Sequence, residues 1–351
     1  MISKDVEYWL RIIEQHMVKE CIANRDIFIW GAYSKGLIIK KALEEQGYTP
    51  KGFIDSYKIE YQGRKVYHPE EVLKLSPKPF IFVAIEIIRD SIVSFLSGNG
   101  FEKGVDYIYF TEMIPEIVIE GFRGKYEDVY GNVFQYKGAS LLDNVKIICK
   151  GNDNSLTIGK NFGPLEGGQG RVTIKLSYGG AVLIGDNVHF NGSLVIDATF
   201  GGCVKIGNAY QAESDSVIDA CNGGKVIIGE KVSSGKRLFI SGGELRVGDD
   251  CMISHDVSII GTNSHSIFNL DDGVSISKTK EKPIVIADHV WLGKDATVLY
   301  GSTVGKGSVV GANSVAKGEY PCNSIIAGNI ARVIRTNCTW DRRKNIEFCE
   351  L

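Results

Sequence analysis

The sequence predicts a fold of the α/β plus all-β class, in which a Rossmann-like parallel sheet is followed by a β-helix of stacked triangular coils. Two observations lead to this prediction. Apolar strand patterns alternate with helical patterns in the first part of the chain, and a glycine-rich internal repeat fills the second part. We expect an α/β domain over residues 1–118, a linker over 119–140, a β-helix over 141–340 and a C-terminal tail over 341–351.

The alternation in the first domain is read directly from consecutive segments. "SKDVEYWLRIIEQHMVKECI" has the apolar spacing of a helix, and "DIFIWGAYSKG" runs an apolar strand into a glycine turn. "LIIKKALEEQG" follows as a helix closed by Gly47, then "KGFIDS" and "PFIFVAIE" as strands and "IRDSIVSFLSGNG" as a helix. Strands that alternate with helices in this way predict a small parallel sheet.

The turn after the first strand raises the question of a nucleotide site. Gly31 and Gly36 bracket this turn, and Asp55 ends the second strand where a ribose-binding carboxylate is expected. Tyr33 occupies the place where a dinucleotide fingerprint has its middle glycine, and its side chain would crowd a pyrophosphate. Two interpretations stay open, a tight strand-to-helix turn or a site for a nucleotide or nucleotide sugar.

The second half contains an internal repeat with one template. "GGAVLIGDN" from Gly179, "GGCVKIGNA" from Gly201, "GGKVIIGEK" from Gly223 and "GGELRVGDD" from Gly242 match it. The first three copies begin 22 residues apart, and the fourth follows after 19. Small residues at the Gly-Gly positions permit sharp corners, so each copy is expected to form one coil of a solenoid.

Further along, the period shortens to six residues. This spacing fits neither an α-helix nor a single amphipathic strand, but it fits a triangular coil with one aliphatic residue pointing inward on each face. Three such faces make about 18 residues per turn, and the 22-residue copies add a few at a corner. The inward positions are Ile286, Leu292, Val298, Val304 and Val310.

The composition argues against several classes of function. The 351 residues carry a net charge of −2, with 44% hydrophobic and 23% charged residues, which gives no reason to expect a nucleic-acid partner. No apolar run approaches the roughly 20 residues that span a bilayer, and "MISKDVEYWL" lacks the order of a signal peptide. Eight cysteines without a C-x-x-C pair do not indicate a zinc site, and we expect most of them to be reduced and buried. We therefore expect a cytoplasmic protein without membrane insertion or a bound metal.

The segment "IADHVWLGKDATVLYGSTVGKGSVVGANSVAKGEYPCNSIIAGNIARVIR" resembles the hexapeptide-repeat acyltransferases. "DCMISHDVSIIGTNSHSIF", "DHVWLG" and the tail "RTNCTWDR" are similar to O-acetyltransferases of capsular and cell-surface polysaccharides within that family. The resemblance implies a left-handed parallel β-helix, a homotrimer with active sites in clefts between subunits, acetyl-CoA as the acyl donor, and one catalytic histidine.

The resemblance also implies roles for individual residues. His265, in "NSHSIF", matches the catalytic position, where a neutral imidazole with an ordinary pKa near 6.5 can take the proton of an attacking hydroxyl. Trp291 would wall the acceptor pocket, with plain packing as the alternative. Asn263, His289 and His255 are candidate acceptor contacts, although each can also be a surface residue.

Coenzyme A brings phosphates and a pantetheine arm. Gly293 and Ala312 are small residues along which the arm could run, with its amides paired to the coil backbone. The cations expected to hold the phosphates are Lys317, Arg332 and Arg335, and an ordinary charged surface is the alternative for each of them.

The sequence therefore indicates an acetyl-CoA-dependent O-acetyltransferase that modifies a sugar hydroxyl during capsule or O-antigen biosynthesis. His265 would act as general base in a direct attack on the thioester. One enzymatic alternative is N-acetylation of a nucleotide-linked amino sugar, in which Asp55 and the Gly31 turn would hold the nucleotide. A scaffold protein built on a β-helix is the non-enzymatic alternative.

Overall fold

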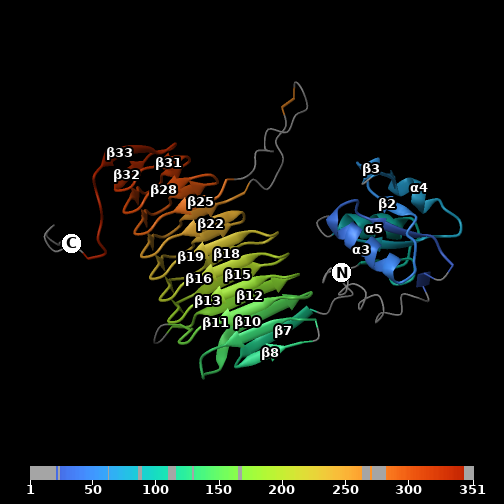
Figure 1. Ribbon diagram of the computed structural model, residues 1–351, viewed down its shortest axis with the longest axis horizontal. Helices are drawn as coiled ribbons and strands as arrows, with labels where there is room; N and C mark the ends of the chain where they lie inside the picture. Colours follow the sequence, from blue (N-terminus) through green and yellow to red (C-terminus); the bar gives the residue numbers. More distant parts are fainter. Residues whose placement is uncertain are drawn as a thin grey trace. The chain divides into compact units, whose positions relative to one another are not determined.

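The chain forms two compact units, Met1–Pro115 and Glu116–Leu351, which are described separately (Figure 1). A computed structural model describes residues 21–22, 24–61, 63–85, 89–109, 116–128, 130–164, 168–262, 269–270 and 282–343. The helix predicted before residue 23 lies mostly outside this part of the chain.

The first unit contains a six-stranded sheet in the order β3-β4-β2-β1-β5-β6. All neighbours pair in parallel except β3 and β4, which confirms the predicted α/β class. Its elements are β1 (Ile27–Trp30), α3 (Ser34–Glu45), β2 (Gly52–Ile54), β3 (Glu60–Tyr61), β4 (Arg64–Tyr67), α4 (Pro69–Leu73), β5 (Phe80–Val83), α5 (Arg89–Gly98) and β6 (Tyr107–Tyr109).

Local sequence explains these elements. β1 and β5 read IFIW and FIFV and are buried at every position, as expected for central strands of a parallel sheet. Helix α3 ends as predicted at Gly47, which has φ +85°. The Tyr48 N–H donates to the Leu43 carbonyl, and this bond satisfies one of the last carbonyls of the helix.

The second unit is built from three long sheets, and each complete coil contributes one strand to each sheet in turn. Sheet I contains β7 (Glu116–Phe122), β10 (Leu142–Lys150), β12 (Arg171–Ser177), β15 (Ser193–Ala198), β18 (Ser216–Asp219), β21 (Phe239–Ser241), β24 (Ser258–Ile260), β27 (Thr297–Leu299) and β30 (Val315–Ala316). Sheet II contains β8 (Lys125–Glu127), β9 (Val133–Tyr136), β11 (Ser155–Ile158), β13 (Ala181–Ile184), β16 (Cys203–Ile206), β19 (Lys225–Ile228), β22 (Glu244–Val247), β25 (Ile284–Ile286), β28 (Thr303–Val304) and β31 (Glu319–Tyr320). Sheet III contains β14 (His189–Phe190), β17 (Gln211–Ala212), β20 (Ser233–Ser234), β23 (Met252–Ile253), β26 (Trp291–Leu292), β29 (Val309–Val310), β32 (Ser324–Ala327) and β33 (Arg332–Thr336).

Strands of successive coils pair in parallel, and three stacked parallel sheets of this kind are typical of a left-handed β-helix. Only the ends of the stack turn back. The pairs β7–β10, β8–β9 and β32–β33 are antiparallel, so strands of the same chain cover the coil edge on sheets I and II at the first end and on sheet III at the other.

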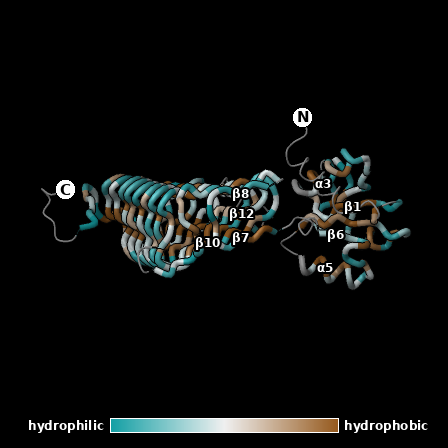
Figure 2. Tube along the Cα trace, turned by 90° about the horizontal axis from the view of Figure 1, so that it is seen from below, coloured by the Kyte–Doolittle hydropathy of each residue, from teal (hydrophilic) through white to brown (hydrophobic). Residues whose placement is uncertain are grey.

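The predicted six-residue period is confirmed by burial. Each of the five aliphatic positions is at most 1% exposed, and they fall on sheets II, III, I, II and III in order. Together with the equivalent residues of the other coils they form one continuous core along the axis, from Phe122 to Ala331. Figure 2 shows the matching rows of hydrophilic residues along the outside of the stack.

The structure differs from the predicted linker over residues 119–140. Strands β7, β8 and β9 occupy most of this segment and pair with the first coils. They lack the repeat template because they form the end of the stack, where β7 and β8 run antiparallel to their neighbours. The second unit accordingly begins at Glu116.

The corner between sheets II and III is built on a column of glycines and acidic or amide side chains. A Cβ added at Gly207 would lie 2.6 Å from the carbonyl carbon and oxygen of Gly229 in the next coil. At several of these corners the N–H of the residue after the glycine is bonded to a side-chain oxygen of the next coil. Examples are Asp186 N–H to Asn208 Oδ1 and Glu230 N–H to Asp249 Oδ1, both at 2.8 Å.

The described cysteines contain no disulfide, and fewer of them are buried than predicted. Cys149 and Cys251 are buried, Cys322 is exposed, and the other four are half-buried. Within the part of the chain that the structure describes, no helix combines the length and apolar character needed to cross a bilayer.

Candidate functional site

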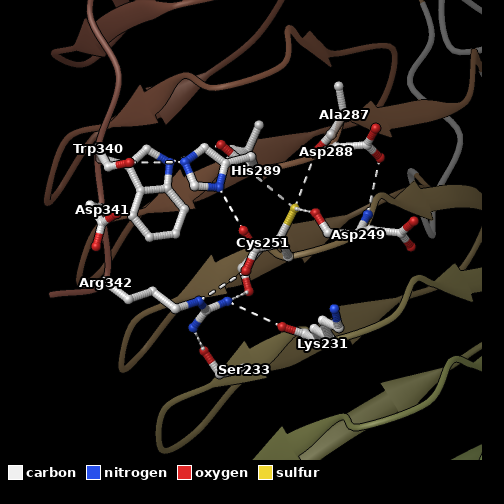
Figure 3. Close-up of polar contacts among 12 residues, drawn as sticks. Lys231, Ser233, Asp249, Cys251, Ala287, Asp288, His289, Trp340, Asp341 and Arg342 are labelled. Carbon is white, nitrogen blue, oxygen red and sulfur yellow. Dashed lines mark hydrogen bonds and ion pairs between the residues drawn. The ribbon is translucent and has the colours of Figure 1, made fainter. Parts of the chain in front are cut away.

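His289 lies at the corner between β25 and β26, where both ring nitrogens have partners and the Trp340 ring lies against the imidazole (Figure 3). Its Nδ1 is 2.7 Å from Asp250 Oδ2, and its Nε2 is 2.9 Å from the carbonyl oxygen of Trp340. Both partners are acceptors, so only the doubly protonated ring can donate to both. The Trp340 ring stacks on the imidazole with centroids 4.4 Å apart, and its Nε1–H donates to the His289 carbonyl at 2.8 Å. His289 therefore anchors the C-terminal segment, and no ring nitrogen remains to contact an acceptor in this arrangement.

Arg342 continues the same anchor onto two earlier coils (Figure 3). Its guanidinium donates to Asp250 Oδ1 at 3.1 Å, Ser233 Oγ at 2.7 Å, the Cys251 carbonyl at 2.8 Å and the Lys231 carbonyl at 3.2 Å. Burial raises the pKa of Asp250, but hydrogen bonds from His289 and Arg342 outweigh it and hold that pKa below its ordinary value of 3.8. The C-terminal segment is thus tied to the coils of β20, β23 and β26.

Replacing Arg342 by glutamine should loosen this segment. The guanidinium makes charge-assisted bonds, and losing them should cost about 1–2 kcal/mol of docking free energy, which is roughly a 5- to 30-fold higher population of undocked tail. Chymotrypsin cleavage after Trp340, which is 7% exposed when docked, would measure that population. Arg343→Gln is the matched control, because that guanidinium pairs with Asp341 two residues earlier. Equal cleavage rates in the two variants would contradict the anchor.

The same docking should weaken in acid. The pKa of Asp250 is lower with the segment docked than its ordinary value, so its contribution is complete above pH 3.8 and is lost as the pH falls through the lowered pKa. Pepsin, which is active in this pH range and also cleaves at aromatic residues, would measure the effect: the cleavage rate of the wild type should rise over that range and approach the rate of Arg342→Gln at the same pH.

Trp291 lies on the outer face of sheet III, between Met252 and Val309 of the neighbouring strands. Its Nε1–H donates to Ser254 Oγ at 3.0 Å, and its ring lies 6.2 Å from the Trp340 ring. The indole is half-buried, so one part packs while another part faces outward. This geometry is compatible with a wall of an acceptor pocket.

His255 lies at the corner between sheets III and I. Its Nδ1 accepts a hydrogen bond from the Lys236 N–H at 3.0 Å, which requires that nitrogen to carry no proton. The same Nδ1 is 3.6 Å from Glu213 Oε2, but without a proton on Nδ1 this contact is not an ion pair. The Nε2 atom therefore carries the proton in this arrangement.

The predicted acceptor contacts lie on different sides of the triangular coil. Trp291 is on sheet III, His289 borders it at the corner with sheet II, and His255 is at the corner with sheet I. Asn263 and His265 lie outside the described residues, in the part of the chain between β24 of sheet I and β25 of sheet II. In a triangular coil the corner between sheets I and II is opposite sheet III.

The residues predicted to bind the coenzyme are near the end of the stack. A Cβ at Gly293 would lie 2.6 Å from Ala312 N, and the Gly293 N–H is bonded to the Val310 carbonyl, so coil stacking alone requires this glycine. The Lys317 ammonium lies 3.0 Å above the Tyr300 ring and donates to the Tyr300 carbonyl at 2.9 Å.

The two predicted arginines are more open to a phosphate. Arg332 and Arg335 are exposed on β33, the last strand of sheet III, and Arg332 donates only to the neighbouring Ala331 carbonyl among the bonds to described residues. Exposed guanidinium groups suit phosphate oxygens.

In the first unit, the glycine turn is filled by its own tyrosine. A Cβ at Gly31 would lie 2.7 Å from the Tyr33 ring, and the Tyr33 hydroxyl donates to the Ala84 carbonyl. A Cβ at Gly36 would overlap the Gly31 carbonyl oxygen. Both glycines are therefore explained by close packing of the turn and the helix.

Asp55 is also used locally. Its Oδ1 accepts the N–H groups of Tyr57 at 2.9 Å and Lys58 at 3.2 Å, which closes a turn after β2. These contacts favour the tight-turn interpretation of the predicted nucleotide residues.

Sequence reasoning assigned no role to Asp250, Trp340 or Arg342. The tail "RTNCTWDR" carried a signal, since it took part in the family resemblance, but the residues that Trp340 and Arg342 bind are 51 to 111 residues earlier in the chain. Such pairings depend on coil stacking and cannot be read from local spacing.

The stacked parallel sheets and the six-residue core period define a hexapeptide-repeat β-helix protein. Comparison with known proteins gives the resemblance predicted from the sequence. The chain is 38% identical over 96 residues to WbbJ of Escherichia coli K12, provisionally named a lipopolysaccharide biosynthesis O-acetyl transferase, which covers 25% of this chain and 48% of WbbJ. It is 29% identical over 126 residues to the polysialic acid O-acetyltransferase of Escherichia coli O1:K1, covering 34% and 40%.

Among solved structures, the polysialic-acid-specific acetyltransferase NeuO has a TM-score of 0.49 at 25% identity, over 59% of this chain and 94% of NeuO. A galactoside acetyltransferase in complex with coenzyme A has a TM-score of 0.28 at 28% identity, over 32% and 55%. No family model matches the chain. The chain spans about half or less of the length of these two curated relatives.

Proposed function

We propose that the chain is an acetyl-CoA-dependent O-acetyltransferase that acetylates a sugar hydroxyl during surface-polysaccharide biosynthesis. The observation that supports this most strongly is the similarity of its coils to O-acetyltransferases, at 38% identity over 96 residues with WbbJ. The protein would act in the cytoplasm as a homotrimer.

His265 is the general base of the proposed reaction. Its neutral imidazole takes the proton of the acceptor hydroxyl while the oxygen attacks the thioester carbonyl. The new C–O bond replaces the C–S bond, and the imidazolium returns the proton to the departing thiolate. Backbone N–H groups beside the carbonyl would stabilise the oxyanion. Acetyl-CoA supplies the activated acetyl group, and Arg332 and Arg335 would pair with its phosphates.

A homotrimer is compatible with the arrangement of the proposed residues. Trp291 is on sheet III, and the segment that carries His265 starts at the opposite corner of the same coil. A cleft that contains both residues could form where the sheet III face of one copy lies against the sheet I–sheet II corner of another. A closed ring of three copies provides three such clefts.

The alternative of nucleotide-linked N-acetylation is less well supported. It requires a nucleotide at the Gly31 turn, where the Tyr33 ring already lies against the backbone. We therefore retain the hydroxyl as the acceptor group.

The test is mass spectrometry after incubation of the full chain with acetyl-CoA and a panel of oligosaccharides. We expect acetyl adducts that mild base or hydroxylamine removes, because esters are labile and amides are not. Adducts found only on amino sugars and resistant to hydroxylamine would replace this proposal with N-acetylation.

A further inference from the structure

A groove of about 720 Å³ lies along the corner between sheets I and II, and the shortening of the repeat explains it. Five residues, 220–224, connect β18 to β19, whereas only Gly242 and Gly243 connect β21 to β22 in the next coil. The three missing residues are the difference between the 22- and 19-residue spacings. The corner therefore recedes at that coil and leaves a notch.

The floor of the notch is tightly packed and its walls are polar. A Cβ at Gly242 would lie 2.9 Å from Thr262 Cγ2, and one at Gly243 would lie 2.6 Å from the Gly261 carbonyl oxygen, so the floor accepts no larger side chain. The volume is within the range of small-molecule sites. The lining residues with polar side chains are Asp219, Asn222, Lys225, Ser241, Glu244 and Thr262.

The chemistry of this lining suits sugar hydroxyls. Carboxylates, an amide and hydroxyls accept and donate hydrogen bonds in the way that a polyol requires. The lining contains two carboxylates, Asp219 and Glu244, and one ammonium, Lys225, so it has a net charge of −1. The described residues that line the notch include no aromatic side chain.

Cys221 reports the same negative environment and takes no part in covalent chemistry. Burial raises the pKa of its thiol to about 12, with further contributions from the hydrogen bond and charge of Asp219 and the charge of Asp197. A thiol in this state is not a nucleophile at neutral pH. The notch is accordingly a binding surface.

The notch lies close in the chain to the proposed catalytic base. Thr262 lines it, and His265 follows three residues later. Because an extended chain spans at most about 3.6 Å per residue, the Cα of His265 is within about 11 Å of the Cα of Thr262. This reach is compatible with one oligosaccharide that occupies the notch and extends to the proposed base.

We propose that the notch binds the acceptor chain beside the modified sugar, and that its two carboxylates select an uncharged oligosaccharide over an anionic one such as a sialic acid polymer. This inference rests on the proposed function. Charge-assisted hydrogen bonds from hydroxyls to Asp219 and Glu244 hold the neutral chain, whereas like charge repels a polyanion.

The test compares Glu244→Gln with Glu319→Gln in the full chain. Both glutamates are exposed first residues of strands in sheet II, but Glu319 lies three coils further on and outside the notch. For a neutral oligosaccharide acceptor we expect KM to rise about five- to tenfold in Glu244→Gln, with kcat and the KM for acetyl-CoA within about twofold of the wild type. Glu319→Gln should leave all three unchanged.

Saturation-transfer NMR without acetyl-CoA separates the two proposals. We expect a clear saturation-transfer signal for a neutral oligosaccharide and a weak one for a sialic acid oligomer. The signal of the sialic acid oligomer should increase in Glu244→Lys. If Glu244→Gln transfers acetyl groups with an unchanged KM for the acceptor, the proposed binding role of the notch is wrong and the proposed acetyltransferase activity stands. If no acetyl transfer is found, the proposed acetyltransferase activity is wrong. The NMR contact would still decide whether the notch binds sugar.

Discussion

The variant His265→Ala is expected to lose acetyl transfer by a factor of about 10²–10⁴ in kcat/KM, because it lacks the imidazole that takes the proton of the acceptor hydroxyl. Coenzyme binding and the subunit assembly should be unchanged, since neither depends on this imidazole. Initial rates with acetyl-CoA and the best acceptor would give the first quantity, and calorimetry and light scattering the other two.

A second histidine serves as control. His189 is a half-buried residue of β14 whose Nδ1 lies 3.3 Å from the Gly163 carbonyl, several coils from the proposed chemistry. His189→Ala should keep wild-type turnover. Near-normal activity in His265→Ala would remove the proposed base and with it the direct-attack mechanism.

The second large effect concerns the coil stack. Gly207→Ala places a Cβ 2.6 Å from the Gly229 carbonyl group and 2.8 Å from Glu230 N, and these backbone atoms belong to the next coil. The two coils must separate locally, which breaks the parallel pairing on either side. We expect a loss of about 3 kcal/mol in the free energy of unfolding, at the upper end of the usual cost of overpacking. Urea denaturation followed by far-ultraviolet circular dichroism would measure it.

Gly179→Ala is a comparison variant in which backbone strain replaces steric overlap. Gly179 is also a corner glycine, with φ +82°, but a Cβ there has no atom within 4 Å. Its cost should be limited to the left-handed backbone, about 1–2 kcal/mol. A smaller loss at Gly207 than at Gly179 would show that the coils can move apart without penalty.

The sequence predicted the parts of the fold that depend on local repetition. An inward position must be aliphatic on every face, so the six-residue spacing alone was enough to place Ile286 and Val304 in the core, and both are buried. The first strand and the helix that ends at Gly47 were predicted from apolar runs and glycine in the same way.

What the sequence did not predict depends on contacts between distant segments. Strands β7 to β9 carry no six-residue period because they close the end of the stack. The sequence pattern therefore predicted a linker over residues 119–140. His289 was predicted to contact an acceptor, but its ring nitrogens are used by Asp250 and Trp340, which are 39 and 51 residues away in the chain. The role of His265 stays a prediction.

The anchor formed by Trp340 and Arg342 changes how a solenoid can come apart. Repeat stacks hold together through adjacent turns, so their last turns can fray one at a time. Here the chain end reaches back past those turns to Lys231, 111 residues earlier. The last coils are therefore held between the earlier coils and the C-terminal segment. Unfolding from that end must begin with release of this segment.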